Sequence, residues 1–216
     1  KDLNKNLNNL NTLNKQLTTG KEISKPSDNP FKTARIMQMY SDISANKQYN
    51  ENIKDTINWL DTTDVALEQI GNSAQRIREL MVSAGNASYG SDEKNALKEE
   101  INEKINEIAQ VLNTNYDGKY IFGGTKSLSK PVGVEKDSNG NNILVFKDDN
   151  GNSFNEEGKA YIKNADGTIT RDANGNLAVE ANPKPEYEKL LNQMKSSLNV
   201  EVSNGVNMSY NVGTPS

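Results

Sequence analysis

Clustered acidic residues are the first feature that could carry chemistry, because paired carboxylates serve as general acids and bases. Four of them lie between residues 99 and 107: Glu99, Glu100, Glu103 and Glu107. Lysines alternate with them at helical spacings, at positions 94, 98 and 104. Such alternation is typical of a solvated helix face with i,i+4 ion pairs, so we assign no catalytic residue here.

Asp- and Asn-rich turns are the second candidate, because carboxylate and amide oxygens bind calcium. The segment from Asp137 to Asn141 resembles the first half of an EF-hand loop. It lacks the glycine at the sixth position and the bidentate glutamate at the twelfth. Similar turns begin at Asp148, Asn164 and Asp172. We interpret all four as Asn-Gly or Asp-Gly hairpin turns and assign no metal.

The polar segment from Gln75 to Leu80 leaves two interpretations open. Arg76 and Glu79 lie three residues apart on a predicted helix, and Arg78 is offset from both. An ordinary surface ion pair would contribute little to stability. A contact between subunits is the alternative, because arginine can bind a carboxylate at two points.

The composition excludes several function classes. The chain has no histidine and no cysteine, so cysteine nucleophiles, thiolate zinc sites and serine–histidine triads are impossible. Its 25 basic and 29 acidic residues give a net charge of −4 without the concentrated basic face that nucleic acid requires. No apolar run approaches the ~20 residues that span a bilayer. We expect no enzyme activity, no cofactor, no nucleic acid and no membrane partner.

Helical patterns fill the first half of the chain. Residues 3–18 carry a heptad seam of leucines in which Asn14 occupies one of the apolar positions. The segment that packs on this seam belongs either to the same chain or to another subunit. Gly20 is expected to end this helix, and Asp28 or Asn29 to cap the next one, with Pro30 in its first turn. The seam leucines are Leu3, Leu7, Leu10 and Leu17.

A second helix is predicted over residues 31–84, which at 1.5 Å per residue would extend about 80 Å. One compact domain does not need so long a helix, whereas a rod does. Ser91 is expected to cap a third helix that runs to Leu112 and packs antiparallel on the second. The second helix has one apolar stripe that drifts in heptad phase: Ile36, Met39, Tyr40, Ile43, Ile53, Ile57, Leu60, Leu67, Ile70, Ala74, Ile77, Met81 and Ala84.

From Tyr116 the pattern changes to short β-prone runs between turns, at residues 120–122, 143–146, 160–162, 168–170 and 177–179. One helix is expected over residues 185–198, followed by two strand-like runs. The fold class is therefore α+β. Residues 1–116 are expected to form an elongated, coiled-coil-like helical rod of a long helix plus an antiparallel one, and residues 117–216 a mostly β outer domain.

Three stretches resemble the bacterial flagellin superfamily: QLTTGKEISKPSDNPFKTAR from Gln16, NIKDTINWLDTTDVALEQIGNSAQRIRELMVSAGNASYG from Asn52, and GKYIFGGTKS from Gly118. KPSDNP and GGTK are typical of its hook–filament junction branch, whereas filament flagellins read more like AKDDAAG. Members carry further residues at both termini. We therefore expect this chain to be a fragment lacking both extreme termini.

The resemblance implies a secreted, extracellular structural subunit of the bacterial flagellum, an adaptor between hook-associated subunits and flagellin. It implies several partners: copies of itself in a ring, hook-associated protein 1, flagellin, the flagellar type III export apparatus with an export chaperone, and a host innate receptor. The alternatives are a filament flagellin or, from another class, a glycan-binding module in the β-rich region.

The resemblance also implies where subunits meet. The corner between the first two helices is expected to contact a stacked subunit, and the QRxREL region to pack between subunits. The expected subunit-interface residues are Lys25, Pro26, Ser27, Asp28, Asn29, Pro30, Arg35, Gln75, Arg76, Arg78, Glu79 and Leu80.

Overall fold

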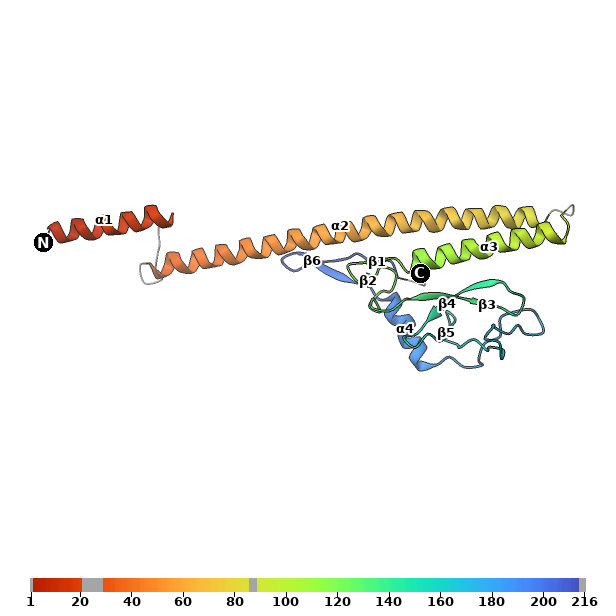
Figure 1. The fold of residues 1–216 in the computed structure, drawn as a ribbon. Coiled ribbons are helices and arrows are strands. Elements are labelled where there is room, and N and C mark those ends of the chain that lie inside the picture. The colour runs from red at the N-terminus through yellow and green to blue at the C-terminus, as the bar shows by residue number, and fades with distance from the viewer. Residues whose placement is uncertain (1, 21–28, 86–88, 214–216) are drawn as a thin grey trace. The chain divides into compact units, whose positions relative to one another are not determined.

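The computed structural model of the chain describes residues 2–20, 29–85 and 89–213. It is an α+β protein, as the sequence predicts, with four helices and seven short strands in the described ranges (Figure 1). The chain divides into two compact units, Lys1–Glu51 and Asn52–Ser216, and the boundary falls within the second helix. Each unit is described by itself.

The first unit consists of helix α1, Asp2–Thr19, and the beginning of helix α2, Pro30–Ala84. Gly20 follows α1 with a φ of 64°, which confirms its predicted role in ending the helix. Asn29 caps α2, since its Oδ1 accepts a hydrogen bond of 3.1 Å from the backbone N–H of Lys32. Asp28, the other predicted cap, lies outside the described residues.

The second unit pairs the later part of α2 with α3, Ser91–Leu112, which runs antiparallel to it (Figure 1). Ser73 Oγ donates to Glu107 of α3 at 2.9 Å, and Arg76 forms an ion pair with Glu100 at 2.7 Å. The predicted helical hairpin is thus confirmed. The predicted cap is wrong, because Ser91 is the first helical residue and Gly90 occupies the cap position without a side chain to accept a hydrogen bond.

Three small antiparallel sheets complete the second unit. Strands β1, Asn115–Tyr116, and β2, Lys119–Tyr120, form a hairpin, and β6, Asn199–Ser203, pairs with β7, Val206–Ser209. The central sheet has the order β3-β4-β5, from β3, Val132–Lys136, β4, Asn142–Lys147, and β5, Ser153–Phe154. Helix α4, Pro185–Lys195, ends three residues before the predicted limit.

Four of the predicted strands are corrected by the structure. In the run at 120–122 only Tyr120 belongs to a strand, because Ile121 and Phe122 turn into the apolar cluster around Trp59. The runs at 160–162, 168–170 and 177–179 form only isolated bridges, such as Tyr161 with Val179 and Arg171 with Leu177. Each run is three residues long and stands between two tight turns, so a continuous ladder has no room to develop. The result is an irregular arm beside the central sheet.

The Asp-rich turns use their oxygens within the chain. Asp137 Oδ1 accepts hydrogen bonds from the backbone N–H groups of Asn139 and Asn141, and Arg171 forms an ion pair with its Oδ2 at 2.7 Å. Burial alone would raise the pKa of Asp137, but the hydrogen bonds from Asn141 and Arg171 outweigh it and lower the pKa. The turns beginning at Asp148 and Asp172 repeat this geometry.

Two apolar clusters hold the second unit together. The first joins the central sheet to α4 through Phe154, Tyr187 and Met194, and the rings of Phe154 and Tyr187 stack at 4.5 Å. The second surrounds Trp59 of α2 with Phe122 and its neighbours. Trp59 is only 5% exposed, which confirms its predicted role in packing.

A half-buried charge network makes the stability of the second unit sensitive to acid. Glu135 on β3 accepts hydrogen bonds from Ser153 at 2.7 Å, from Lys163 at 2.9 Å and from Lys147. Burial by itself raises the pKa of Glu135, but these donors outweigh it and lower the pKa to about 2. The charged carboxylate therefore stabilises the folded state at neutral pH.

We expect the stability of the chain to fall as the pH drops from about 4.5 towards 2. A carboxyl whose pKa is lower in the folded than in the unfolded state contributes stability above its unfolded pKa and loses it on protonation. This lowering of the pKa corresponds to roughly 3 kcal/mol of stability at neutral pH. Urea unfolding of the chain and of Glu135→Gln between pH 2 and 7 measures it. If both proteins show the same slope against pH, Glu135 is not the responsible group.

Candidate subunit-interface surface

Helix α2 carries two heptad seams side by side in the second unit. Positions spaced alternately three and four apart share one face of a helix. One seam, here called the buried seam, faces α3 and the surrounding strands, with every member buried or half-buried. Its members are Thr56, Trp59, Thr63, Ala66, Ile70, Ser73, Ile77 and Leu80.

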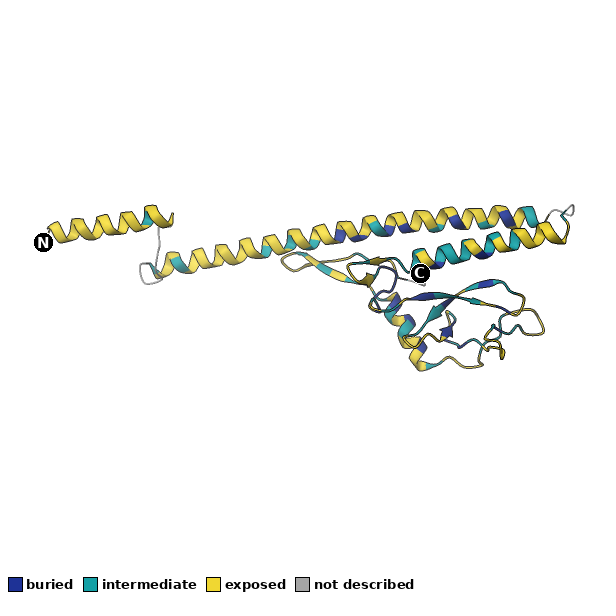
Figure 2. Cartoon of the chain, viewed as in Figure 1, coloured by how far each residue is buried: buried dark blue, intermediate teal, exposed yellow. Residues whose placement is uncertain are grey.

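The other seam, here called the exposed seam, lies next to it on the helix surface. Its positions alternate in the same way, three and four residues apart, and Asp64, Gly71 and Arg78 occupy those that are not apolar or are glycine. Its larger side chains are 36–63% exposed, and Figure 2 shows yellow, exposed residues along α2 even where α3 lies against it. Its apolar members are Ile53, Ile57, Leu60, Leu67, Ala74 and Met81.

The sequence analysis placed the apolar residues of the exposed seam in one drifting stripe with Ile70 and Ile77 of the buried seam, and that interpretation is wrong. The two phases are two faces of the helix with different partners. Fully burying a leucine or isoleucine is worth about 1.5–3 kcal/mol, so an exposed seam with four of them is a surface suited to another helix.

The first unit shows the same property. All of the seam leucines of α1 are exposed, from Leu7 at 52% to Leu17 at 78%, and α1 has no buried residue in its described length. On α2, Phe31 is 81% exposed and Met37 is 65% exposed. The heptad pattern of α1 is therefore present without a helix packed against it within the described residues.

The structure separates the predicted interface residues into several groups. Asn29 caps α2, and Pro30 and Arg35 are exposed on its first turns. Lys25, Pro26, Ser27 and Asp28 lie outside the described residues. Gln75, Arg78 and Glu79 are exposed, and they line a shallow surface depression together with Ala74 and Val82.

Two of the predicted residues make contacts within the chain. Leu80 is 3% exposed, and it belongs to the buried seam. Arg76 donates from Nε and Nη2 to Glu100 Oε1 of α3, at 2.8 and 2.7 Å, and its Nη1 lies 3.4 Å from Glu79. Hydrogen bonding to Glu100 raises the pKa of Arg76.

We expect Arg76→Ala to change the thermal midpoint of unfolding by no more than about 2 °C, since exposed ion pairs contribute little. Circular dichroism melting measures this change, with Glu100→Gln as the matched removal of the other partner. A drop of ten degrees in either variant would show that the pair is a main support of the helical hairpin.

The described parts of the chain contain neither a metal-binding cluster nor a membrane-spanning helix. No group of three or more acidic side chains that could hold a metal ion occurs in the described ranges. No helix there combines the length and apolar content needed to cross a bilayer. A long heptad-patterned helix with one buried and one exposed seam is typical of structural assembly proteins. In this class, helices of neighbouring subunits pack against the exposed seam.

The comparisons with known proteins identify the family within that class. Residues 1–127, more than half of the chain, match the model of the bacterial flagellin N-terminal helical region. The chain therefore belongs to the bacterial flagellin family, whose members are structural proteins rather than enzymes.

The curated relatives are flagellins. The chain is 29% identical over 145 residues to a flagellin of Salmonella paratyphi A, which covers 67% of this chain and 29% of the relative. It is 29% identical over 134 residues to the phase 1 flagellin of Salmonella naestved, covering 62% and 26%. The chain thus spans less than a third of the length of these relatives.

Two solved structures share the fold. A candidate flagellar hook-associated protein from Vibrio parahaemolyticus aligns with a TM-score of 0.55 at 17% identity, over 88% of this chain and 63% of that one. Flagellar hook-associated protein 3 from Legionella pneumophila aligns with a TM-score of 0.52 at 18% identity, over 82% and 39%. At these identities the likeness establishes the fold alone.

Proposed function

We propose that this chain is part of a structural subunit of the bacterial flagellum that joins the hook to the filament. The exposed seam of α2, in a chain of the flagellin family, is the observation that carries the proposal. Such a seam suits lateral contacts between copies, and heterologous contacts of this kind build rings and helical arrays. The motifs KPSDNP and GGTK and the hook-associated fold favour the junction over the filament.

The proposal includes specific partners. Copies of the subunit form a ring, with hook-associated protein 1 on the hook side and flagellin on the filament side. The type III export apparatus and an export chaperone deliver the subunit through segments outside this chain, to an extracellular location. In the same scheme residues 1–116 are the rod domain and residues 117–216 the outer domain.

The interface is proposed at two places. The corner from Lys25 to Pro30, with Arg35, contacts a stacked subunit. The exposed side chains of Gln75, Arg78 and Glu79 contact a lateral neighbour or, in a host, an innate receptor. Leu80 is buried in the buried seam and Arg76 pairs with Glu100 of α3, so both face other parts of the same chain.

Deletion of the full-length gene tests the junction role. The mutant is expected to assemble hooks, to release soluble flagellin into the medium and to carry no attached filaments. Complementation with the wild-type gene should restore filaments. Complementation with a gene lacking residues 20–34 should restore secretion of the subunit but not filaments, and normal filaments would refute the proposed role of this corner.

A filament flagellin is the second candidate, because the curated relatives are flagellins. The two roles differ in copy number. Quantitative mass spectrometry of sheared filaments should find this protein as a trace component beside an abundant flagellin. If it is the main protein of the filament, the junction proposal is wrong.

A further inference from the structure

A pocket in the second unit combines aromatic walls with charged side chains. It has a volume of about 620 Å³ and is lined by residues from α2, from the β1–β2 hairpin, from β6 and from the segment that follows β7. Pockets of roughly 300–1,000 Å³ with apolar walls and a few placed polar groups are typical of small-molecule sites. Nothing in the proposed assembly role uses this pocket.

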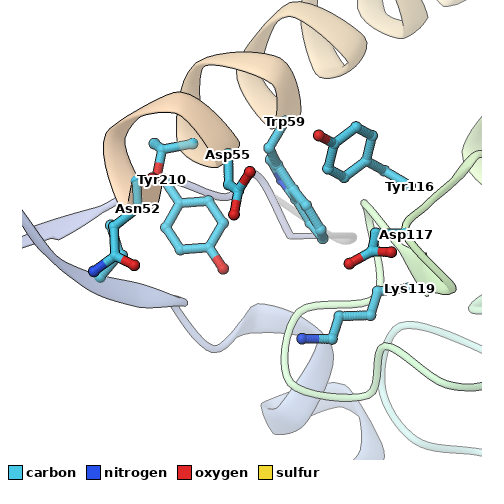
Figure 3. A pocket seen from close by; sticks show the side chains of 9 residues that line it. Asn52, Asp55, Trp59, Tyr116, Asp117, Lys119 and Tyr210 are labelled. Carbon is cyan, nitrogen blue, oxygen red and sulfur yellow. The ribbon is translucent and has the colours of Figure 1, made fainter. Parts of the chain in front are cut away.

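The aromatic part of the pocket is rigidly held. Trp59 packs edge to face with Tyr116 at 5.9 Å and with Tyr210 at 5.6 Å, and all three belong to the cluster around Phe122. In Figure 3, Asp55 and Tyr210 lie on one side of the indole, and Tyr116 and Asp117 lie on the other. The walls are therefore formed before any ligand arrives.

The hairpin turn positions two of the charged groups. Asp117 and Gly118 have φ values of 49° and 77°, so they form the two-residue turn with positive φ that suits a tight hairpin. Tyr116 and Lys119 are directly paired across this turn. The turn therefore holds an aromatic ring, a carboxylate and an ammonium group at one side of the pocket.

Three charged side chains line the rim of the pocket. Within the described ranges, the carboxylates of Asp55 and Asp117 and the ammonium of Lys119 form no ion pair or hydrogen bond, although all three line the same pocket. Two acceptor groups and one donor group thus surround an aromatic surface.

We propose that this pocket binds a short neutral saccharide of two or three pyranose units. Hydroxyl groups both donate and accept, so one sugar can donate to Asp55 and Asp117 and accept from Lys119. Pyranose rings present an apolar C–H face that packs on tyrosine. A cationic ligand would satisfy both carboxylates and gain from the aromatic faces, but it would lie beside the ammonium of Lys119 and leave it without an acceptor.

The position of the only tryptophan makes binding measurable on the unmodified chain. We would titrate the protein with maltotriose, cellotriose, lactose and N,N′-diacetylchitobiose up to about 20 mM, a range that detects millimolar affinities. At least one is expected to give a saturable change in Trp59 fluorescence with a stoichiometry of one. No response to any of the four would overturn the proposal.

Matched variants locate the binding. Asp55→Asn and Asp117→Asn are each expected to weaken binding by about tenfold, because each removes a charged acceptor. Asp61→Asn, which makes the same change on an exposed part of α2 outside the pocket, should leave the affinity within about twofold. Equal affinity in all three variants would place the sugar elsewhere and refute the site.

Two cationic probes test the rival ligand class. Tetramethylammonium and N-acetyl-arginine amide are expected to give no saturable response over the same range. A response to either of them without a response to sugars would reassign the pocket to a cation. Circular dichroism of each variant confirms that it retains the fold. Failure of this test leaves the assembly role untouched, because the exposed seam does not include these residues.

Discussion

Replacing Ile57 and Leu60 by aspartate in the full-length protein is expected to abolish filament attachment without unfolding the subunit. Both side chains belong to the exposed seam, at 51% and 41% exposure, so the folded chain loses little when they become charged. In an assembly the same carboxylates would be buried against a neighbouring helix without a partner, which is strongly unfavourable. Electron microscopy should count at least tenfold fewer filaments per cell.

The control for this experiment lies on the same helix. Asn58→Asp adds a negative charge at an exposed position on the opposite side of α2 from the exposed seam. It should leave filament number unchanged. Thermal unfolding of the purified chains should give similar midpoints for all variants. Filaments of normal number in the double variant would mean that this seam is not covered in the assembly.

Substitution of Gly124 by alanine is expected to lower the free energy of unfolding by about 4 kcal/mol or more. Gly124 has a φ of 56°, and an added Cβ would lie 2.4 Å from the carbonyl oxygen of Gln193 and 2.5 Å from that of Met194. Both are backbone atoms at the end of α4, so they cannot turn aside. Thr125 fixes the approach, since its N–H and its Oγ1 donate to Gln193 at 2.9 and 3.0 Å.

Gly167→Ala is the comparison variant. Gly167 also has a positive φ, but no backbone atom lies close to the position of an added Cβ. Its φ is 86°, and an added Cβ would meet nothing within 4 Å. Only the conformational cost of about 1–2 kcal/mol should remain. Urea unfolding of the two variants measures the difference. Equal losses would show that the GGTK loop does not depend on its close approach to α4.

The helices were the most predictable part of the fold, because their signals are local. Gly20 and Asn29 each fix a helix end through their own backbone or side chain. The irregular arm from residue 155 to 180 was harder. Its turns were recognisable from Asp and Gly, but strand formation depends on a partner of sufficient length, which no local pattern reveals.

The choice between the two seams of α2 could not be made from the sequence. The exposed seam is richer in isoleucine and leucine, so hydrophobicity alone selects the wrong face as the core. The buried seam contains Thr56, Thr63 and Ser73, whose hydroxyls bond to Asn52 O, Trp59 O and Glu107. These small side chains leave room for the surrounding strands and for α3, and their polar atoms remain satisfied.

The proposed saccharide pocket could not be predicted from the sequence, for a related reason. Its residues come from three segments that are far apart in the chain, and only Trp59 attracted attention by its rarity. Asp55 and Lys119 are unremarkable in a sequence in which a quarter of the residues are charged. Their meeting depends on the packing of Tyr116 and Tyr210 against one indole.

The contacts around Trp59 also determine when the second unit can fold. Asn52 Nδ2 donates to Glu201 O across 149 positions of sequence, and Trp59 meets Tyr210 at a similar separation. Such high contact order slows folding, since a very long loop must close before these contacts form. During synthesis the α2–α3 hairpin emerges long before the residues that seal it. The second unit therefore stays incompletely folded until the segment around Tyr210 has been made.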